Sequence, residues 1–151
     1  MQKIIITALI ILSAVAGCTK KEEAATTSTP PAAATATTGG GDIGVGPVSS
    51  VTLEAELKAD LVKNGHDLFA AKCAACHKVD ERYVGPAIKG VTERRKPEWI
   101  MNMILNPQEM TQKDPVAQEL LGEYMTQMTF QNVTQDEARA ILEYFRSIDK
   151  K

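Results

Sequence analysis

The sequence predicts an all-α domain of about four short helices joined by long loops. From residue 51 onward, apolar residues recur at intervals of three and four, as they do along one face of an α-helix. No stretch shows the strict alternation of apolar and polar residues that is typical of a half-buried strand. Prolines and helix-capping residues stand where several of the periodic stretches begin. The 151 residues leave room for one such domain.

The first two helices are predicted from apolar spacing and from proline. The first runs up to Cys73, with Gly65 as a weak point or a place of close approach. Pro97 suits the first turn of the second helix, which should end before Pro107. The apolar residues of the first helix are Leu53, Leu57, Leu61, Leu68 and Phe69, and those of the second are Trp99, Ile100, Met103 and Ile104.

The last two helices carry their own start signals. Asp114 reads as an N-cap and Pro115 as the first helical position of the third helix, which continues through Tyr124. Thr134 and Glu137 have the spacing of a capping box, so they predict the start of the last helix. Its apolar face comprises Ala138, Ile141, Leu142, Phe145 and Ile148.

The N-terminus has the composition of an export signal. Lys3 precedes an apolar run over residues 4–16, which is shorter than the about 20 residues that a membrane span needs. The tetrapeptide at residues 15–18, Val-Ala-Gly-Cys, resembles the bacterial lipobox. That resemblance implies removal of residues 1–17 as a lipoprotein signal peptide and lipid on Cys18. An ordinary cleaved signal with an incidental cysteine is the alternative.

Residues 18–50 are predicted to be a lipidated cysteine followed by a disordered tether. The segment is rich in Ala, Thr, Ser, Pro and Gly, and Ile43 is its first large apolar residue. Such a composition buries too little apolar surface to offset the entropy of ordering the chain. The folded domain is therefore expected over residues 51–151.

Composition excludes one class of partner and predicts a large non-protein group in the core. The formal net charge of −2 gives no footprint for neutralising phosphates, so we expect no nucleic acid to bind. Long irregular segments such as residues 78–96 and 125–133 leave few side chains for the core of so small a domain. A bound group of large apolar area would fill that space.

Cys73, Cys76 and His77 form the motif Cys-x-x-Cys-His, by which c-type haem is attached. The two thiols add to the haem vinyl groups, and the imidazole of the next residue binds one face of the iron. A structural zinc or iron–sulfur site would want four ligands, and outside the motif the domain offers only His66. A thioredoxin-like redox pair would need a β-α-β setting, which the sequence lacks. The cofactor predicted is therefore one covalent haem c with its iron.

The stretch from Gly65 to Val91 resembles the N-terminal half of a class I cytochrome c, and the likeness continues through the last helix. It rests on Gly65, Leu68 and Phe69 before the motif, and on Val84-Gly85-Pro86 and Gly90-Val91 after it. The resemblance implies that Gly65 lets the first helix cross the last helix closely, against Tyr144 or Phe145. It also implies that the carbonyl of Pro86 accepts the Nδ1 proton of His77. Trp99 or Tyr83 is a candidate to lie near a haem propionate, and packing in the core is the alternative for Trp99.

The sixth iron ligand is predicted to be a methionine. In the family the axial methionine lies some five residues before the apolar position that precedes the last helix, which implies Met128. Thr129 stands where proline commonly follows that ligand, so Met125 stays open as the runner-up. An open sixth position is the other alternative. Met110 is a less favoured candidate because it lies in what reads as a short connection, and His66 is better explained as a solvated residue on a helix face.

The function implied is the transfer of single electrons by a membrane-anchored, periplasmic, mono-haem cytochrome, and not catalysis. The alternative is a gas-binding sensor or a peroxidase-like enzyme with an open sixth position. The expected partners are redox proteins, such as a quinol-oxidising complex and a periplasmic terminal reductase, since the domain resembles cytochromes that accompany such reductases. We expect a monomer on the periplasmic side of a bacterial membrane, either inner or outer.

Overall fold

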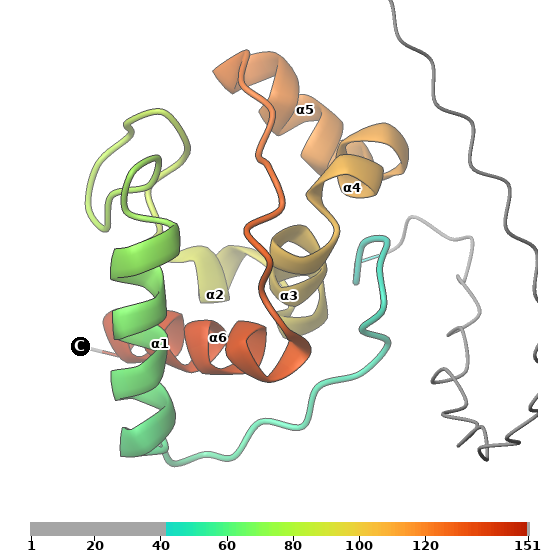
Figure 1. Ribbon diagram of the computed structural model, residues 1–151. Helices are drawn as coiled ribbons and strands as arrows, with labels where there is room; N and C mark the ends of the chain where they lie inside the picture. The colour runs from blue at the N-terminus through green and yellow to red at the C-terminus, as the bar shows by residue number, and fades with distance from the viewer. Residues whose placement is uncertain (1–41, 151) are drawn as a thin grey trace, which may run out of the picture. The chain divides into compact units, whose positions relative to one another are not determined.

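The computed structural model describes residues 42–150, which form six α-helices and no strand (Figure 1). This confirms the all-α prediction. No helix within that range combines the length and the apolar character needed to cross a bilayer. The helices are α1 (Ala59–Lys72), α2 (Val91–Arg94), α3 (Pro97–Leu105), α4 (Pro107–Lys113), α5 (Pro115–Tyr124) and α6 (Gln135–Asp149).

Two of these helices, α2 and α4, were not predicted. Helix α4 occupies the stretch around Met110 that reads as a short connection in the sequence. Its first residue is Pro107, which fits there because the first turn of a helix leaves its N–H groups without intrahelical partners. A proline after an apolar run therefore ends α3 and begins α4 directly. The structure therefore has six helices where about four were predicted.

The start of the first helix was predicted too early, because residues 51–58 are not helical. Contacts with α6 take up the backbone groups of this segment. The N–H of Lys58 donates to the Glu143 carboxylate at 3.3 Å, and the Arg146 guanidinium donates to the carbonyl of Glu54 at 2.7 Å. Tertiary hydrogen bonds thus override the helical spacing of Leu53 and Leu57.

Glu143 is a buried charge with strong partners. Its side chain is 1% exposed and accepts from Arg139 at 2.6 Å and from Arg146 at 2.8 Å. Burial by itself would raise the pKa of this carboxyl, but the hydrogen bonds from both arginines and from the Lys58 N–H outweigh it, so the pKa lies below its usual range. The ionised carboxylate therefore stabilises the contact between α6 and residues 54–58.

The tether boundary at residue 50 was placed too late, because residues 42–50 pack on the domain. Val45 and Val48 are 5% and 2% exposed. The Asn102 side chain on α3 accepts from the N–H of Val48 and donates to the carbonyls of Ile43 and Val48, each at 2.9 Å. The buried side-chain amide of Asn102 thus makes the hydrogen bonds to this backbone that a strand or helix would make elsewhere. The amino-acid composition of residues 42–50 does not predict such a partner.

The predicted helix caps of α5 and α6 are present. Asp114 accepts from the N–H of Ala117 at 2.9 Å and from the indole Nε1 of Trp99 at 3.1 Å, so it also joins α3 to α5. Thr134 and Glu137 form the capping box of α6. The Asp114 cap fixes where α5 begins, and the Thr134 capping box fixes where the segment between α5 and α6 ends.

Helices α1 and α6 cross where Gly65 faces Ala140 (Figure 1). A Cβ on Gly65 would overlap the carbonyl of Ala140 and would lie 2.9 Å from Cβ of Tyr144. Because both neighbours belong to another helix, only a residue without a side chain permits this approach. The contact is with Tyr144, one of the two aromatic residues expected, and it holds α1 in the position from which the cysteine motif follows.

We expect Gly65→Ala to destabilise the domain by about 1–3 kcal/mol or more, because the added methyl group must push α1 away from α6. Gly122→Ala on α5 is the matched control, since nothing lies within 4 Å of the Cβ that it adds. The control should be neutral or stabilising by up to about 1 kcal/mol through helix propensity. Guanidinium unfolding of the two variants checks this, and equal effects would contradict the close crossing.

Candidate functional site

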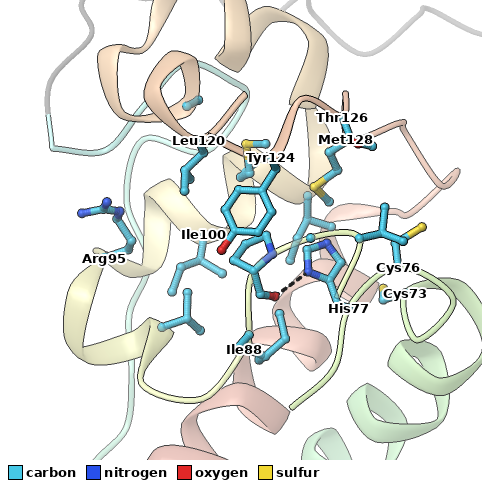
Figure 2. A pocket seen from close by; sticks show the side chains of 18 of the residues that line it. Cys73, Cys76, His77, Ile88, Arg95, Ile100, Leu120, Tyr124, Thr126 and Met128 are labelled. Atoms are coloured by element: carbon cyan, nitrogen blue, oxygen red, sulfur yellow. Dashed lines mark hydrogen bonds between the residues drawn. The ribbon is translucent and has the colours of Figure 1, made fainter. Parts of the chain in front are cut away.

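A cavity of about 550 Å³ opens between the C-terminal end of α1, the loop after His77, α3, α5 and the segment between α5 and α6. Cys73, Cys76, His77 and Met128 all line it (Figure 2). Much of the remaining wall is apolar, with Phe69, Val84, Pro86, Ile88, Val91, Trp99, Ile100, Met103, Ile104, Ala117, Leu120, Leu121, Ile141 and Phe145.

The cysteine motif forms a tight turn at the end of α1. The N–H of Cys73 still donates to the helical carbonyl of Phe69 at 2.9 Å. The N–H groups of Cys76 and His77 then both donate to the carbonyl of Cys73, at 3.0 and 2.9 Å. This turn brings all three side chains of the motif to one cavity wall.

His77 is held in a defined orientation. Its Nδ1 lies 3.0 Å from the carbonyl oxygen of Pro86. Since a carbonyl can only accept, Nδ1 carries the proton and the Nε2 lone pair is left for a metal. A Cβ on Gly85 would lie 2.5 Å from Cε1 of His77, so glycine is needed for the loop to pass this close to the ring.

Both thiols of the motif are free of a disulfide bond. Cys76 is exposed, whereas Cys73 is partly buried and burial raises the pKa of its thiol.

His66 lies outside the cavity wall, edge-on to Tyr144 with ring centroids 5.3 Å apart. No group of three or more His, Cys, Asp or Glu side chains with metal-binding geometry occurs within residues 42–150.

The two candidate methionines have different surroundings. Met128 lines the cavity, and Figure 2 shows its sulfur on the side toward His77. Met125 caps α5 in the left-handed conformation (φ 51°), is 84% exposed and is not part of the cavity wall. Met110 is fully buried elsewhere, where its sulfur accepts from the N–H of Val45 at 2.9 Å.

Of the two residues expected near a propionate, Trp99 lines the cavity and Tyr83 does not. The only N–H of the Trp99 indole already donates to Asp114, and Tyr83 is 56% exposed. Arg95 also lines the cavity, with its guanidinium carbon 5.3 Å from the centroid of the Trp99 ring. It supplies a positive charge that could hold a carboxylate of a bound cofactor.

The family profile described as Cytochrome c matches residues 62–149, a range that contains the motif, the cavity wall and α6. The chain belongs to the cytochrome c family. Its cofactor is therefore covalently attached haem c with iron, as the motif predicts. Free thiols, an imidazole with its Nε2 available and a largely apolar cavity fit that group.

Individual relatives agree with this assignment. A cytochrome c-553-like protein of Synechocystis is 36% identical over 67 residues, which cover 42% of this chain and 63% of that protein. The cytochrome c of Rhodothermus marinus is 47% identical with a TM-score of 0.68, over 70% of this chain and 90% of that one. An engineered form of it bound to a carbene intermediate is 44% identical with a TM-score of 0.66, over 70% and 92%.

Three contacts at the site were not predicted. Arg82, Lys72 and Gln127 connect the chain around Met128 to its surroundings. In the sequence, Arg82 is one of several basic residues around the motif and has no feature that distinguishes it. Cys18 lies outside the described residues.

Proposed function

We propose that this cytochrome carries single electrons between redox proteins on the periplasmic side of a bacterial membrane, to which Cys18 anchors it through lipid. In this proposal Cys73 and Cys76 bind the haem covalently, and His77 and Met128 are the two axial ligands of its iron. When bound, haem c supplies an iron that alternates between the ferric and ferrous states.

One observation carries the proposal: His77 and Met128 line the same cavity. An imidazole and a thioether on opposite faces would occupy both axial positions, which leaves none for a substrate and raises the reduction potential. The Pro86 carbonyl keeps the imidazole in the tautomer whose Nε2 is free to bind a metal. These residues are suited to electron exchange without bond-breaking chemistry.

The cavity wall favours an acidic redox partner. Lys72, Arg82, Lys89, Arg94 and Arg95 line it, and among residues 42–150 Glu123 is the only acidic residue that does so. A basic rim would steer a negatively charged surface toward the cavity in a small, transient interface. We propose a quinol-oxidising complex as donor and a periplasmic terminal reductase as acceptor, on the basis of the sequence resemblance.

Mass spectrometry and a potentiometric titration test the electron-carrier proposal together. The mature protein, made with the haem-attachment machinery, should carry the mass of one haem. It should then titrate reversibly with the slope of a single electron. The mass of bare polypeptide, or a titration that is not a reversible one-electron step, would contradict the proposal.

The lipid anchor is tested separately by Cys18→Ser. This change removes the thiol that the lipid would occupy, so the domain should move from the membrane fraction to the soluble fraction, because a multiply acylated cysteine is what makes such anchoring stable. Fractionation followed by the haem absorption measures the distribution. Unchanged membrane association would show that another segment or a protein partner holds the domain there.

A further inference from the structure

The segment that carries Met128 has little support from its own backbone. Residues 126–133 lie between α5 and α6, and none of their N–H or C=O groups makes a backbone–backbone hydrogen bond. We call residues 125–133 the Met128 loop. Because regular structure does not fix its path, side-chain contacts must do so.

Arg82 holds the last residues of α5, which directly precede the Met128 loop, from across the cavity. Its guanidinium donates to the Glu123 carboxylate at 2.7 Å and to the Glu123 carbonyl at 2.9 Å. It also lies 4.1 Å from the centroid of the Tyr124 ring. Arg82 belongs to the segment between His77 and Pro86, so these contacts join the histidine side of the cavity to the methionine side.

Lys72 holds the other end of the loop. Its ammonium group donates to the carbonyls of Gln131 and Asn132, at 3.2 and 3.3 Å. Lys72 is the last residue of α1 and directly precedes Cys73. Of the two cations that flank the cysteine motif, Arg82 therefore holds the helix end from which the loop starts, and Lys72 holds the loop near its C-terminal end. A third contact, between the hydroxyl of Thr111 and the Gln127 side chain at 3.0 Å, ties the loop to α4.

We propose that Arg82 and Lys72 are positioning residues that keep the Met128 loop closed over the cavity and so keep the Met128 sulfur at the iron. This inference rests on the proposed role of Met128 as axial ligand. Neither cation touches the iron. Each stabilises the closed loop relative to an open one in which Met128 has left and the sixth position is free.

An external ligand reports on the open loop directly. Imidazole can bind the ferric iron only when Met128 has left, so its apparent dissociation constant is the intrinsic constant divided by the open fraction. A half-exposed ion pair and a cation–π contact are each weak, but Arg82 combines them with a hydrogen bond to a carbonyl. We expect Arg82→Gln to raise the apparent imidazole affinity about 5- to 30-fold, the equivalent of about 1–2 kcal/mol.

The experiment titrates the oxidised holoprotein with imidazole and follows the visible spectrum, for the wild type, Arg82→Gln, Arg82→Lys and Lys72→Gln. The apparent imidazole affinity of Arg82→Lys should lie between those of the wild type and Arg82→Gln. Lysine keeps the positive charge but loses the two N–H donors that point in fixed directions from a guanidinium group. Lys72→Gln should also raise the affinity. If Arg82 and Lys72 only stabilised the fold, their variants would unfold at a lower concentration of guanidinium chloride. The apparent imidazole affinity in buffer without denaturant would then be unchanged.

Lys63→Gln is the matched control. It removes one positive charge and one exposed ion pair, with Asp67 at 2.8 Å, and neither residue lines the cavity or contacts the Met128 loop. Its imidazole affinity should equal that of the wild type. An equal rise in the control would overturn the proposal, and a variant of Arg82 or Lys72 that binds imidazole as the wild type does would overturn the role of that residue. Met128→Ala separates the two claims: unchanged imidazole affinity in that variant would reject the ligand assignment itself.

Discussion

Met128→Ala should lower the reduction potential by on the order of 100 mV or more, since axial ligands set haem potentials over a range of about 0.8 V. Met128 lines the cavity with its sulfur toward His77, and alanine at this position has no atom that binds iron. The oxidised variant should also lose the weak red absorption band of an iron–thioether bond. A potentiometric titration and the visible spectrum measure both effects.

Met125→Ala is the control for this prediction. Met125 is 84% exposed and outside the cavity wall, so its removal should leave the potential and the red band unchanged. If Met125→Ala removes the band while Met128→Ala keeps it, the ligand lies three residues earlier in the chain and the loop must rearrange on haem binding. The proposed electron transfer would survive that outcome.

Replacing both Cys73 and Cys76 with alanine should abolish covalent haem and, with it, cooperative folding. Without the haem, the apolar side chains around a cavity of about 550 Å³ in the middle of the domain lose the surface that they pack against and face water. A domain is typically stable by only about 5–15 kcal/mol, so it does not tolerate the loss of so much of its core. Circular dichroism and thermal unfolding should therefore show loss of the native transition.

Acidified organic solvent tests the covalent part of this prediction. It should extract haem from any double variant that retains it and leave haem on the wild-type polypeptide. Each single cysteine variant keeps one possible thioether and serves as an intermediate control. Haem that remains attached to the double variant, or a cooperative native transition in the haem-free double variant, would contradict the account.

The features that were predicted correctly depend on residues close together in sequence. Asp114 and Thr134 cap helices through N–H groups three residues away, and the cysteine motif forms its turn within five residues. The packing of residues 42–50 depends instead on Asn102, more than fifty residues away in sequence. The spacing of residues within the segment contains no information about such a partner. The tether was therefore predicted to extend to residue 50, although residues 42–50 pack on the domain.

The residues of the candidate site likewise differ in whether nearby sequence could predict them. The local motif identifies Cys73, Cys76 and His77, and the family resemblance singles out Met128. The contacts of Arg82 with Glu123 join residues 41 positions apart, and those of Lys72 with the loop join residues about sixty positions apart. Only the folded chain brings these pairs together, which is why the sequence predicts Met128 as a ligand but does not predict these contacts.

The central claim is that both axial positions of the haem iron are taken by residues of this chain, and carbon monoxide tests it most directly. The visible spectrum of the reduced wild-type holoprotein should be the same with and without carbon monoxide, because His77 and Met128 leave no free position. Met128→Ala should show the spectral shift of a carbon monoxide complex under the same conditions. Ready binding by the wild type would contradict the electron-carrier account and favour the gas-binding or peroxidase-like alternative.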